Sequence, residues 1–413
     1  MTRKPEAAAR APRVTAAPTP PIAACVTPAE PLLLDVGRLV WRGWAGRLPT
    51  GIDRVCHAYL DRYAGRAHGV IQWKGRRFVL PPGDTARLAA LLASDAADRR
   101  PRLAALLARA LPHAVRPPRR GALYLNVGHT GLDDPGLVGW IARHALRAVH
   151  FIHDLIPLET PEYCRPGEAA RHERRMRHAL ASASGIIGNS QATLDALDAF
   201  GAARGLPRPP AVAAWLAADA LPRAAAPVIA ERPYFVAVGT IEGRKNHLLL
   251  LQLWRALAQR LGATAPRLVL VGQRGWEAAD AMALLDRCAA LAPLVEERGR
   301  CDDAALAALL SGARALLMPS FAEGYGMPLV EAMRLGVPVI ASDLAVFREI
   351  AGTIPTYLSP LDATAWERTV LDYAGESAAR ERQRAALRDY RAPDWSTHFA
   401  AVEPWLAALP ARG

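Results

Sequence analysis

The stretch Phe321–Met333, FAEGYGMPLVEAM, carries residues whose types and spacing could bind a sugar nucleotide. Glu323 and Glu331 bracket two glycines and a proline. Carboxylates accept hydrogen bonds from sugar and ribose hydroxyls, and glycines let bare backbone N–H groups approach a phosphate closely. A nucleotide-sugar presents hydroxyls at both ends and phosphate between them, so the arrangement suits that class of ligand. The alternative is a helix N-terminus in which the macrodipole favours two acids.

A second candidate is TIEGRKNH at residues 240–247, which follows an apolar run that ends at Gly239. Arg244 and Lys245 stand just before a predicted helix, and Lys245 is one of only three lysines in an arginine-rich chain. Two cations beside the N–H groups of a helix start could bind a diphosphate, arginine as a fork and lysine as a point charge. The alternative is a solvated basic turn.

Both motifs follow predicted strands, and the strands recur along the chain. Short apolar runs, each followed by a turn and a helical stretch, occupy residues 31–36, 122–128, 148–154, 184–190, 234–239, 267–272, 315–320 and 337–342. This alternation predicts an α/β fold of parallel sheets with helices on both faces. Ligands bind outside the carboxyl ends of such strands, which is where both motifs lie.

The domain organisation follows from a Pro/Ala-rich stretch after which the strand–helix pattern restarts. We predict a disordered leader at 1–30, an N-terminal domain at 31–216, a linker at 217–232, a C-terminal domain at 233–390, and a segment at 391–413 that packs back on the N-terminal domain. In the C-terminal domain, Pro328 suits the first position of a helix that stops at Gly336, a natural C-cap. Asp302 and Asp303 are interpreted as helix-capping acids, and no metal site is expected.

Composition excludes several classes of protein. The net charge of +12 is diffuse and accompanies no nucleic-acid-binding module, so no nucleic-acid partner is expected. No apolar run approaches the roughly 20 residues that span a bilayer, and the N-terminus lacks the apolar region of a signal peptide. From these two features we predict a cytoplasmic protein. The five scattered cysteines then indicate reduced thiols.

Residues 84–120 contain two leucine-rich amphipathic stretches separated and followed by arginines. They predict a helical pair that packs on the first domain. The alternative is a basic patch that makes peripheral contact with the inner membrane at its cytoplasmic face, or with a lipid-linked substrate.

The Glu-x₇-Glu spacing of Glu323 and Glu331, with Arg244 and Lys245 upstream, resembles the donor-site signature of the retaining glycosyltransferases of family 4. The segments LPTGIDRV at 48–55 and FIHDLIPLETPEY at 151–163 also fit, and the likeness extends over most of 31–350. The resemblance implies the GT-B fold, in which two Rossmann-like, doubly wound parallel-sheet domains face a central cleft.

The resemblance also implies roles for individual residues. Glu323 would contact the donor sugar, Glu331 the ribose, and Arg244 and Lys245 the departing diphosphate. His153 would lie beside the transferred sugar, with a polar contact or a general base as alternatives. The remaining donor-binding positions would be Gly51, Gly239, Gly324, Tyr325, Gly326, Met327, Arg300 and Cys301. The N-terminal loop reads TGIDR where many members carry two adjacent glycines or GIGR, so Asp53 is a departure on the acceptor side.

The implied activity is a metal-independent, retaining hexosyltransferase without a cofactor. It would transfer mannose, with GDP-mannose favoured over UDP-sugars, to a glycan or lipid-linked acceptor in bacterial surface polysaccharide synthesis, for lipopolysaccharide or exopolysaccharide. The acceptor's proton would pass to the leaving phosphate oxygen. Two alternatives are a sugar-nucleotide epimerase of the same architecture, which needs no acceptor, and a non-catalytic nucleotide-sugar binder.

Overall fold

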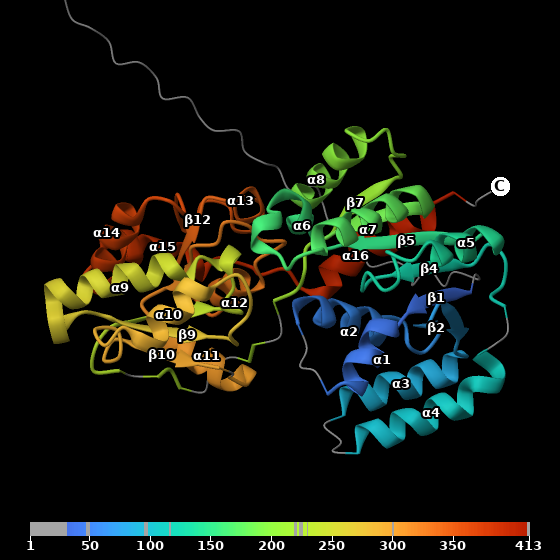
Figure 1. The fold of residues 1–413 in the computed structure, drawn as a ribbon, viewed down its shortest axis with the longest axis horizontal. Helices are drawn as coiled ribbons and strands as arrows, with labels where there is room; N and C mark the ends of the chain where they lie inside the picture. The colour runs from blue at the N-terminus through green and yellow to red at the C-terminus, as the bar shows by residue number, and fades with distance from the viewer. Residues whose placement is uncertain are drawn as a thin grey trace, which may run out of the picture.

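The computed structural model describes residues 31–46, 50–94, 98–114, 117–218, 221–222, 226–228, 230–299 and 301–410. These residues form two α/β halves, each built on its own sheet (Figure 1). The predicted leader at 1–30 lies outside the described residues, as do parts of the predicted linker and residues 411–413.

The first half contains a seven-stranded sheet in the order β3-β2-β1-β4-β5-β6-β7. Its strands are β1 Leu32–Asp35, β2 His68–Trp73, β3 Arg76–Val79, β4 Leu123–Asn126, β5 Arg147–Ile152, β6 Ala183–Gly188 and β7 Ala211–Ala213. Its helices are α1 Gly37–Trp44, α2 Gly51–Tyr63, α3 Pro82–Ala93, α4 Arg99–Ala114, α5 Pro135–Arg143, α6 Ile156–Glu159, the 3₁₀ turn η1 Pro161–Tyr163, α7 Glu168–Ser182 and α8 Gln191–Ala202. Strands β1, β4, β5 and β6 lie where the sequence predicts strands, because β-branched and leucine-rich runs buried on both faces are typical of parallel sheets.

One edge of this sheet departs from the predicted parallel arrangement. Strands β2 and β3 form an antiparallel hairpin in which Trp73 is opposite Arg76. The two residues between them, Lys74 and Gly75, both have positive φ, at 46° and 75°. Tight hairpin turns of this kind match the twist of the flanking strands. This antiparallel hairpin at the edge of an otherwise parallel sheet was not predicted from the sequence.

The second half contains a six-stranded sheet in the order β10-β9-β8-β11-β12-β13, and all its paired strands are parallel. The strands are β8 Tyr234–Val238, β9 Arg267–Val271, β10 Val295–Arg298, β11 Leu316–Met318, β12 Val339–Ser342 and β13 Thr356–Leu358. The helices are η2 Gly243–Lys245, α9 His247–Leu261, η3 Gly262–Thr264, α10 Ala279–Arg287, α11 Asp303–Gly312, α12 Met327–Arg334, α13 Ala345–Ala351, α14 Ala363–Ala374 and α15 Ala378–Arg388.

The chain passes between the halves twice, after β7 and again before α16 (Trp395–Ala408). The two connections touch, because the Ala218 N–H donates to the Pro393 carbonyl at 3.2 Å. Helix α16, drawn in red in Figure 1, then packs on the first half. There His398 Nε2 is 2.9 Å from the Tyr59 hydroxyl. The end of the chain is thus part of the first half.

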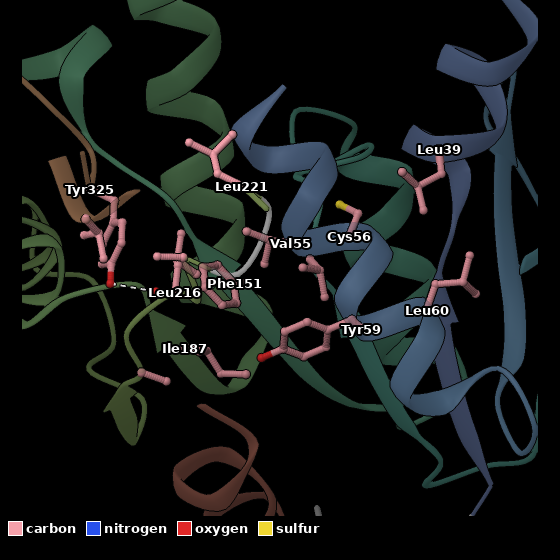
Figure 2. Packing of buried hydrophobic residues seen from close by; sticks show 14 of the residues in the cluster. Leu39, Val55, Cys56, Tyr59, Leu60, Phe151, Ile187, Leu216, Leu221 and Tyr325 are labelled. Carbon is pink, nitrogen blue, oxygen red and sulfur yellow. Dashed lines mark hydrogen bonds between the residues drawn. The ribbon is translucent and has the colours of Figure 1, made fainter. Parts of the chain in front are cut away.

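An apolar cluster links the two halves (Figure 2). It contains Val55 and Tyr59 of α2, Phe151 of β5, Leu216 of the first connection, and Tyr325 of the loop before α12. The Tyr325 hydroxyl donates to the Leu216 carbonyl at 2.9 Å. This contact fixes the loop before α12 against the segment that crosses between the halves.

The predicted helical pair at 84–120 is present as α3 and α4, which pack against each other. Leu88, Leu91 and Leu103 are buried, so the leucine stripes serve this packing. Within the described residues, no helix has the length and apolar content needed to cross a bilayer.

Candidate active site

A cleft of about 3280 Å³ lies between the two halves. Its walls include residues that follow β4 and β5 in the first sheet and β8, β9 and β11 in the second. Ligands of parallel α/β sheets bind at this position. Every predicted site residue that the structure describes lines the cleft, and Arg300 lies outside the described residues.

Two cations stand at the carboxyl end of β8. The chain leaves the strand at Gly239, where φ is +138°, and a Cβ at that position would lie 3.0 Å from Lys245 Cε. Glycine therefore lets the lysine stem lie against the backbone. Arg244 Nη2 lies 2.7 Å from Glu242 Oε1, so the arginine is anchored on its own turn. Helix α9 then begins at His247.

Glu323 is the counter-ion of these two cations. Its carboxylate accepts hydrogen bonds from Lys245 Nζ at 2.6 Å, Arg244 Nη1 at 2.9 Å and the Ser320 hydroxyl at 2.8 Å. Burial alone would raise the pKa of Glu323, but Lys245 and Arg244 outweigh it and lower the pKa to about 2. The carboxylate is therefore ionised at neutral pH. Its predicted contact with a donor sugar remains a prediction.

The loop between Glu323 and α12 depends on two glycines. A Cβ at Gly324 would lie 2.8 Å from the His153 carbonyl oxygen, so this residue allows the second half to approach the first. Gly326 is the N-cap of α12 and has φ of +100°. A Cβ there would lie 2.5 Å from Cε1 of the buried Phe347. The two glycines that the sequence singled out thus serve a close approach and a left-handed backbone.

We expect Gly326→Ala to destabilise the protein by about 2 kcal/mol or more, because backbone strain and overpacking against Phe347 add. Gly336→Ala is a matched control at the other end of α12, since Gly336 also has positive φ, 74°, but nothing lies within 4 Å of its Cβ position. Urea unfolding of both variants measures the difference. Equal destabilisation of the two would mean that Phe347 yields and that the steric argument is wrong.

His153 follows β5 and faces this loop from the first half. Its Nε2 is 2.7 Å from the Val127 carbonyl, which can only accept, so Nε2 carries the proton and Nδ1 the lone pair. Burial lowers the pKa of His153 to about 4. A neutral imidazole at neutral pH fits both a polar contact to a sugar and a proton acceptor.

His129 is a neighbour that the sequence analysis missed. Its ring centroid lies 5.1 Å from that of His153, and its Nε2 is buried with no hydrogen-bond partner among the described residues. Burial and His153 hold the pKa of His129 well below its usual value. His129 has φ of +58°, a conformation that histidine tolerates better than most side chains.

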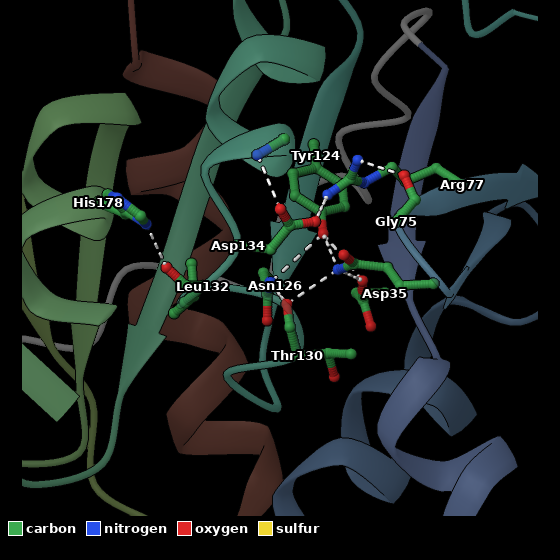
Figure 3. A network of polar contacts seen from close by, with 11 residues as sticks. Asp35, Gly75, Arg77, Tyr124, Asn126, Thr130, Leu132, Asp134 and His178 are labelled. Carbon is green, nitrogen blue, oxygen red and sulfur yellow. Dashed lines mark hydrogen bonds and ion pairs between the residues drawn. The ribbon is translucent and has the colours of Figure 1, made fainter. Parts of the chain in front are cut away.

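A buried polar network holds the loop that carries His129 (Figure 3). Gln72 Nε2 and Asn126 Nδ2 both donate to the Thr130 carbonyl at 2.8 Å. Asp35 in turn accepts from Gln72 at 2.7 Å and from the Tyr124 hydroxyl at 2.8 Å. Burial raises the pKa of Asp35 to about 6 although these hydrogen bonds lower it. Asp35, at the end of β1, therefore positions the loop that carries His129 and Thr130 through its hydrogen bond with Gln72.

Asp53 also has a structural role. Its carboxylate accepts from the Thr50 N–H at 2.6 Å and so caps α2. The same carboxylate pairs with Arg38 and Arg42 of α1, each at 2.6 Å. The departure from the family loop is thus a buried helix cap that holds two arginines at the rim of the cleft.

Glu331 lies within α12 and is paired across the cleft. Arg54 Nη1, from the first turn of α2, lies 2.5 Å from Glu331 Oε1, and Arg54 Nη2 lies 3.4 Å from Asp303. Burial raises the pKa of Glu331, and Arg54 partly offsets this. Arg54 was not predicted as a site residue, although it follows Gly51 by one helical turn in TGIDR. Asp302 caps α11 as expected, accepting from Ala305 at 2.7 Å.

Residues 232–374 match the family described as glycosyl transferases group 1. The chain is 32% identical over 247 residues to O-antigen chain mannosyltransferase B of Escherichia coli, a match that covers 57% of this chain and 63% of that protein. It is 31% identical over 166 residues to phosphatidyl-myo-inositol mannosyltransferase of Mycobacterium tuberculosis, covering 38% of this chain and 41% of that protein. The chain therefore spans less than two thirds of the length of these relatives.

Two solved structures share the fold. HepE of Anabaena in complex with UDP aligns with a TM-score of 0.62 at 17% identity, covering 92% of this chain and 100% of that one. Sucrose-phosphate synthase of Thermosynechococcus elongatus aligns with a TM-score of 0.59 at 18% identity, covering 92% and 99%. The predicted GT-B fold, with two α/β domains on either side of a cleft, is confirmed.

Proposed function

We propose that this chain, whose residues 232–374 form a glycosyl transferases group 1 domain, is a retaining hexosyltransferase that uses a nucleotide diphosphate-sugar. The observation that carries the proposal is one wall of the cleft. Arg244 and Lys245 stand there beside the glycine loop and the N-terminus of α12, and His153 faces them from the other half. Fixed cations and bare N–H groups at one point suit a diphosphate leaving group.

The chemistry that this wall supports is departure of the diphosphate. Breaking the sugar–phosphate bond develops negative charge on the leaving oxygen, and preorganised donors stabilise it before any water must rearrange. Glu323 keeps both cations in place through ordinary ion pairs. The acceptor hydroxyl would pass its proton to the leaving oxygen, with His153 Nδ1 as the alternative proton acceptor. No residue is assigned as a covalent nucleophile, and no cofactor is proposed.

For the donor we propose GDP-mannose in preference to UDP-sugars. Support comes from the two relatives reported above, which are described as mannosyltransferases. HepE was solved with UDP, so uridine nucleotides are the proper comparison. For the acceptor we propose a glycan or a lipid-linked acceptor in bacterial surface polysaccharide synthesis, in line with the O-antigen relative.

A thermal-shift panel of GDP- and UDP-sugars tests the donor without requiring an acceptor. We expect GDP-mannose to raise Tm more than UDP-glucose does at equal concentration. Incubation of the best ligand with and without an oligosaccharide acceptor then separates transfer from epimerisation, because only transfer depends on the acceptor. A chain that no sugar nucleotide stabilises would contradict the proposal.

We also propose peripheral contact with the cytoplasmic face of the inner membrane. Trp44, the last residue of α1, is 42% exposed, and exposed Arg100 of α4 comes within 3.7 Å of the Cβ position of Gly46. An exposed aromatic side chain and an exposed cation on neighbouring segments suit an anionic interface. We expect co-sedimentation with vesicles containing phosphatidylglycerol, weakened by salt and by Trp44→Ala. Equal sedimentation of the variant and the wild type would exclude this face.

A further inference from the structure

Arg54 lies at the point where the two halves of the cleft come together. It belongs to the first turn of α2, which begins at Gly51, and α12 of the other half begins at Met327. A Cβ at Gly51 would lie 3.4 Å from Met327 Sδ, so the N-termini of the two helices are adjacent. Both helix ends carry partial positive charge. An anion between them would meet N–H groups from both halves.

The charges around this point cancel. Glu242 and Glu323 balance Arg244 and Lys245 through the ion pairs described above. Arg54 is balanced by Glu331 across the cleft. A donor diphosphate brings additional negative charge, and these six side chains offer no surplus cation to meet it while every pair is kept.

Glu331 can release Arg54 without being left as a bare buried ion. The Glu331 side chain is 4% exposed, so losing Arg54 with nothing in its place would leave a buried, unpaired carboxylate, which is unfavourable. Two ribose hydroxyls could donate to the carboxylate in place of the guanidinium. Arg54 is one-third exposed, so its side chain has room to move within the cleft.

We propose that Arg54 is an exchangeable cation of the donor site, paired with Glu331 in the unliganded chain and transferred to the donor diphosphate when ribose takes over Glu331. The inference rests on the proposed function, since it takes Glu331 as the ribose contact. It assigns to the first half a binding residue for the phosphates. The Arg54–Glu331 bridge between the halves is then fully replaced only by a ligand that carries both ribose and diphosphate.

The test compares nucleosides with nucleoside diphosphates by titration calorimetry on the full chain. Arg54→Ala should bind GDP about 10- to 100-fold more weakly, because a charge-assisted contact is lost. It should bind guanosine at least as tightly as wild type does, because Glu331 no longer has to exchange a partner. If the thermal-shift panel selects uridine nucleotides, UDP and uridine take the place of GDP and guanosine in this titration. Arg54→Lys keeps the charge and should restore part of the GDP affinity.

Arg62→Ala is the matched control. Arg62 lies two turns further along α2 and pairs with Glu403 of α16, at 2.7 Å, instead of a residue of the second half. It should change neither affinity. If Arg54→Ala weakens guanosine and GDP by the same factor, or weakens neither, Arg54 is only a structural bridge and the inference is overturned. Wild-type protein that binds neither GDP nor UDP would instead overturn the proposed function itself.

Discussion

Lys245→Ala is expected to lower kcat by about 10²- to 10³-fold, with a smaller change in donor KM. Lys245 is held at the cleft by Glu323 and by the close approach of its stem to Gly239. A fixed cation stabilises the leaving diphosphate most strongly when its charge has developed, so its loss weighs more on the transition state than on donor binding. Steady-state kinetics with the donor found in the thermal-shift panel measures both constants.

Lys245→Met separates the charge from the packing in this experiment. Methionine keeps an unbranched stem against Gly239 but has no ammonium group, so its kcat should fall as far as that of the alanine variant. Melting curves of both variants report whether the fold survives the loss of one partner of Glu323. A kcat within twofold of wild type, in a folded variant, would remove Lys245 from the leaving-group role.

The sequence predicted those parts of the site whose residues lie close together along the chain. A strand, a glycine turn and a helix follow one another within about ten residues at Gly239 and again at Gly326, and each residue type has its meaning within that unit. The carboxyl-end rule then brings both units to one edge of the sheet. Periodicity likewise predicted the helical pair α3–α4, because its leucines recur on one face.

What the sequence could not predict depends on contacts between distant segments. Arg54 and Glu331 are 277 residues apart, and no local pattern distinguishes Arg54 from the other arginines of a basic chain. The same holds for Asp53, whose role as a helix cap and partner of two α1 arginines appears only once α1 and α2 are packed. Strand β2 was missed because its hairpin turn, Lys-Gly, carries a weaker signal than Asn-Gly or Asp-Gly.

Glu323→Gln is expected to lower the free energy of unfolding at pH 7 by about 3 kcal/mol or more. It leaves the largely buried Lys245 without its carboxylate and leaves Arg244 with Glu242 alone. The Glu323 side chain is 6% exposed and binds Lys245 and Arg244 at 2.6 and 2.9 Å, whereas glutamine offers one neutral oxygen in the same volume. Urea unfolding followed by tryptophan fluorescence measures the difference. Asp343→Asn is the control, since Asp343 forms an ion pair with Arg348 at the surface and its loss should change little.

The pH dependence of the stability of wild type and of Glu323→Gln tests whether Glu323 acts through its charge. The pKa of Glu323 lies near 2 in the folded chain, below its ordinary value of 4.5, so the carboxylate stabilises the fold fully above pH 4.5. Part of that stabilisation is lost as the pH falls from 4.5 towards 2, because the unfolded chain takes up the proton first. Glutamine has no proton to take up there, so the gap in stability between wild type and Glu323→Gln should narrow as the solution is acidified. A gap that stays constant from pH 7 to pH 3 would mean that Glu323 acts through its shape and hydrogen bonds, and that its charge does not anchor Arg244 and Lys245.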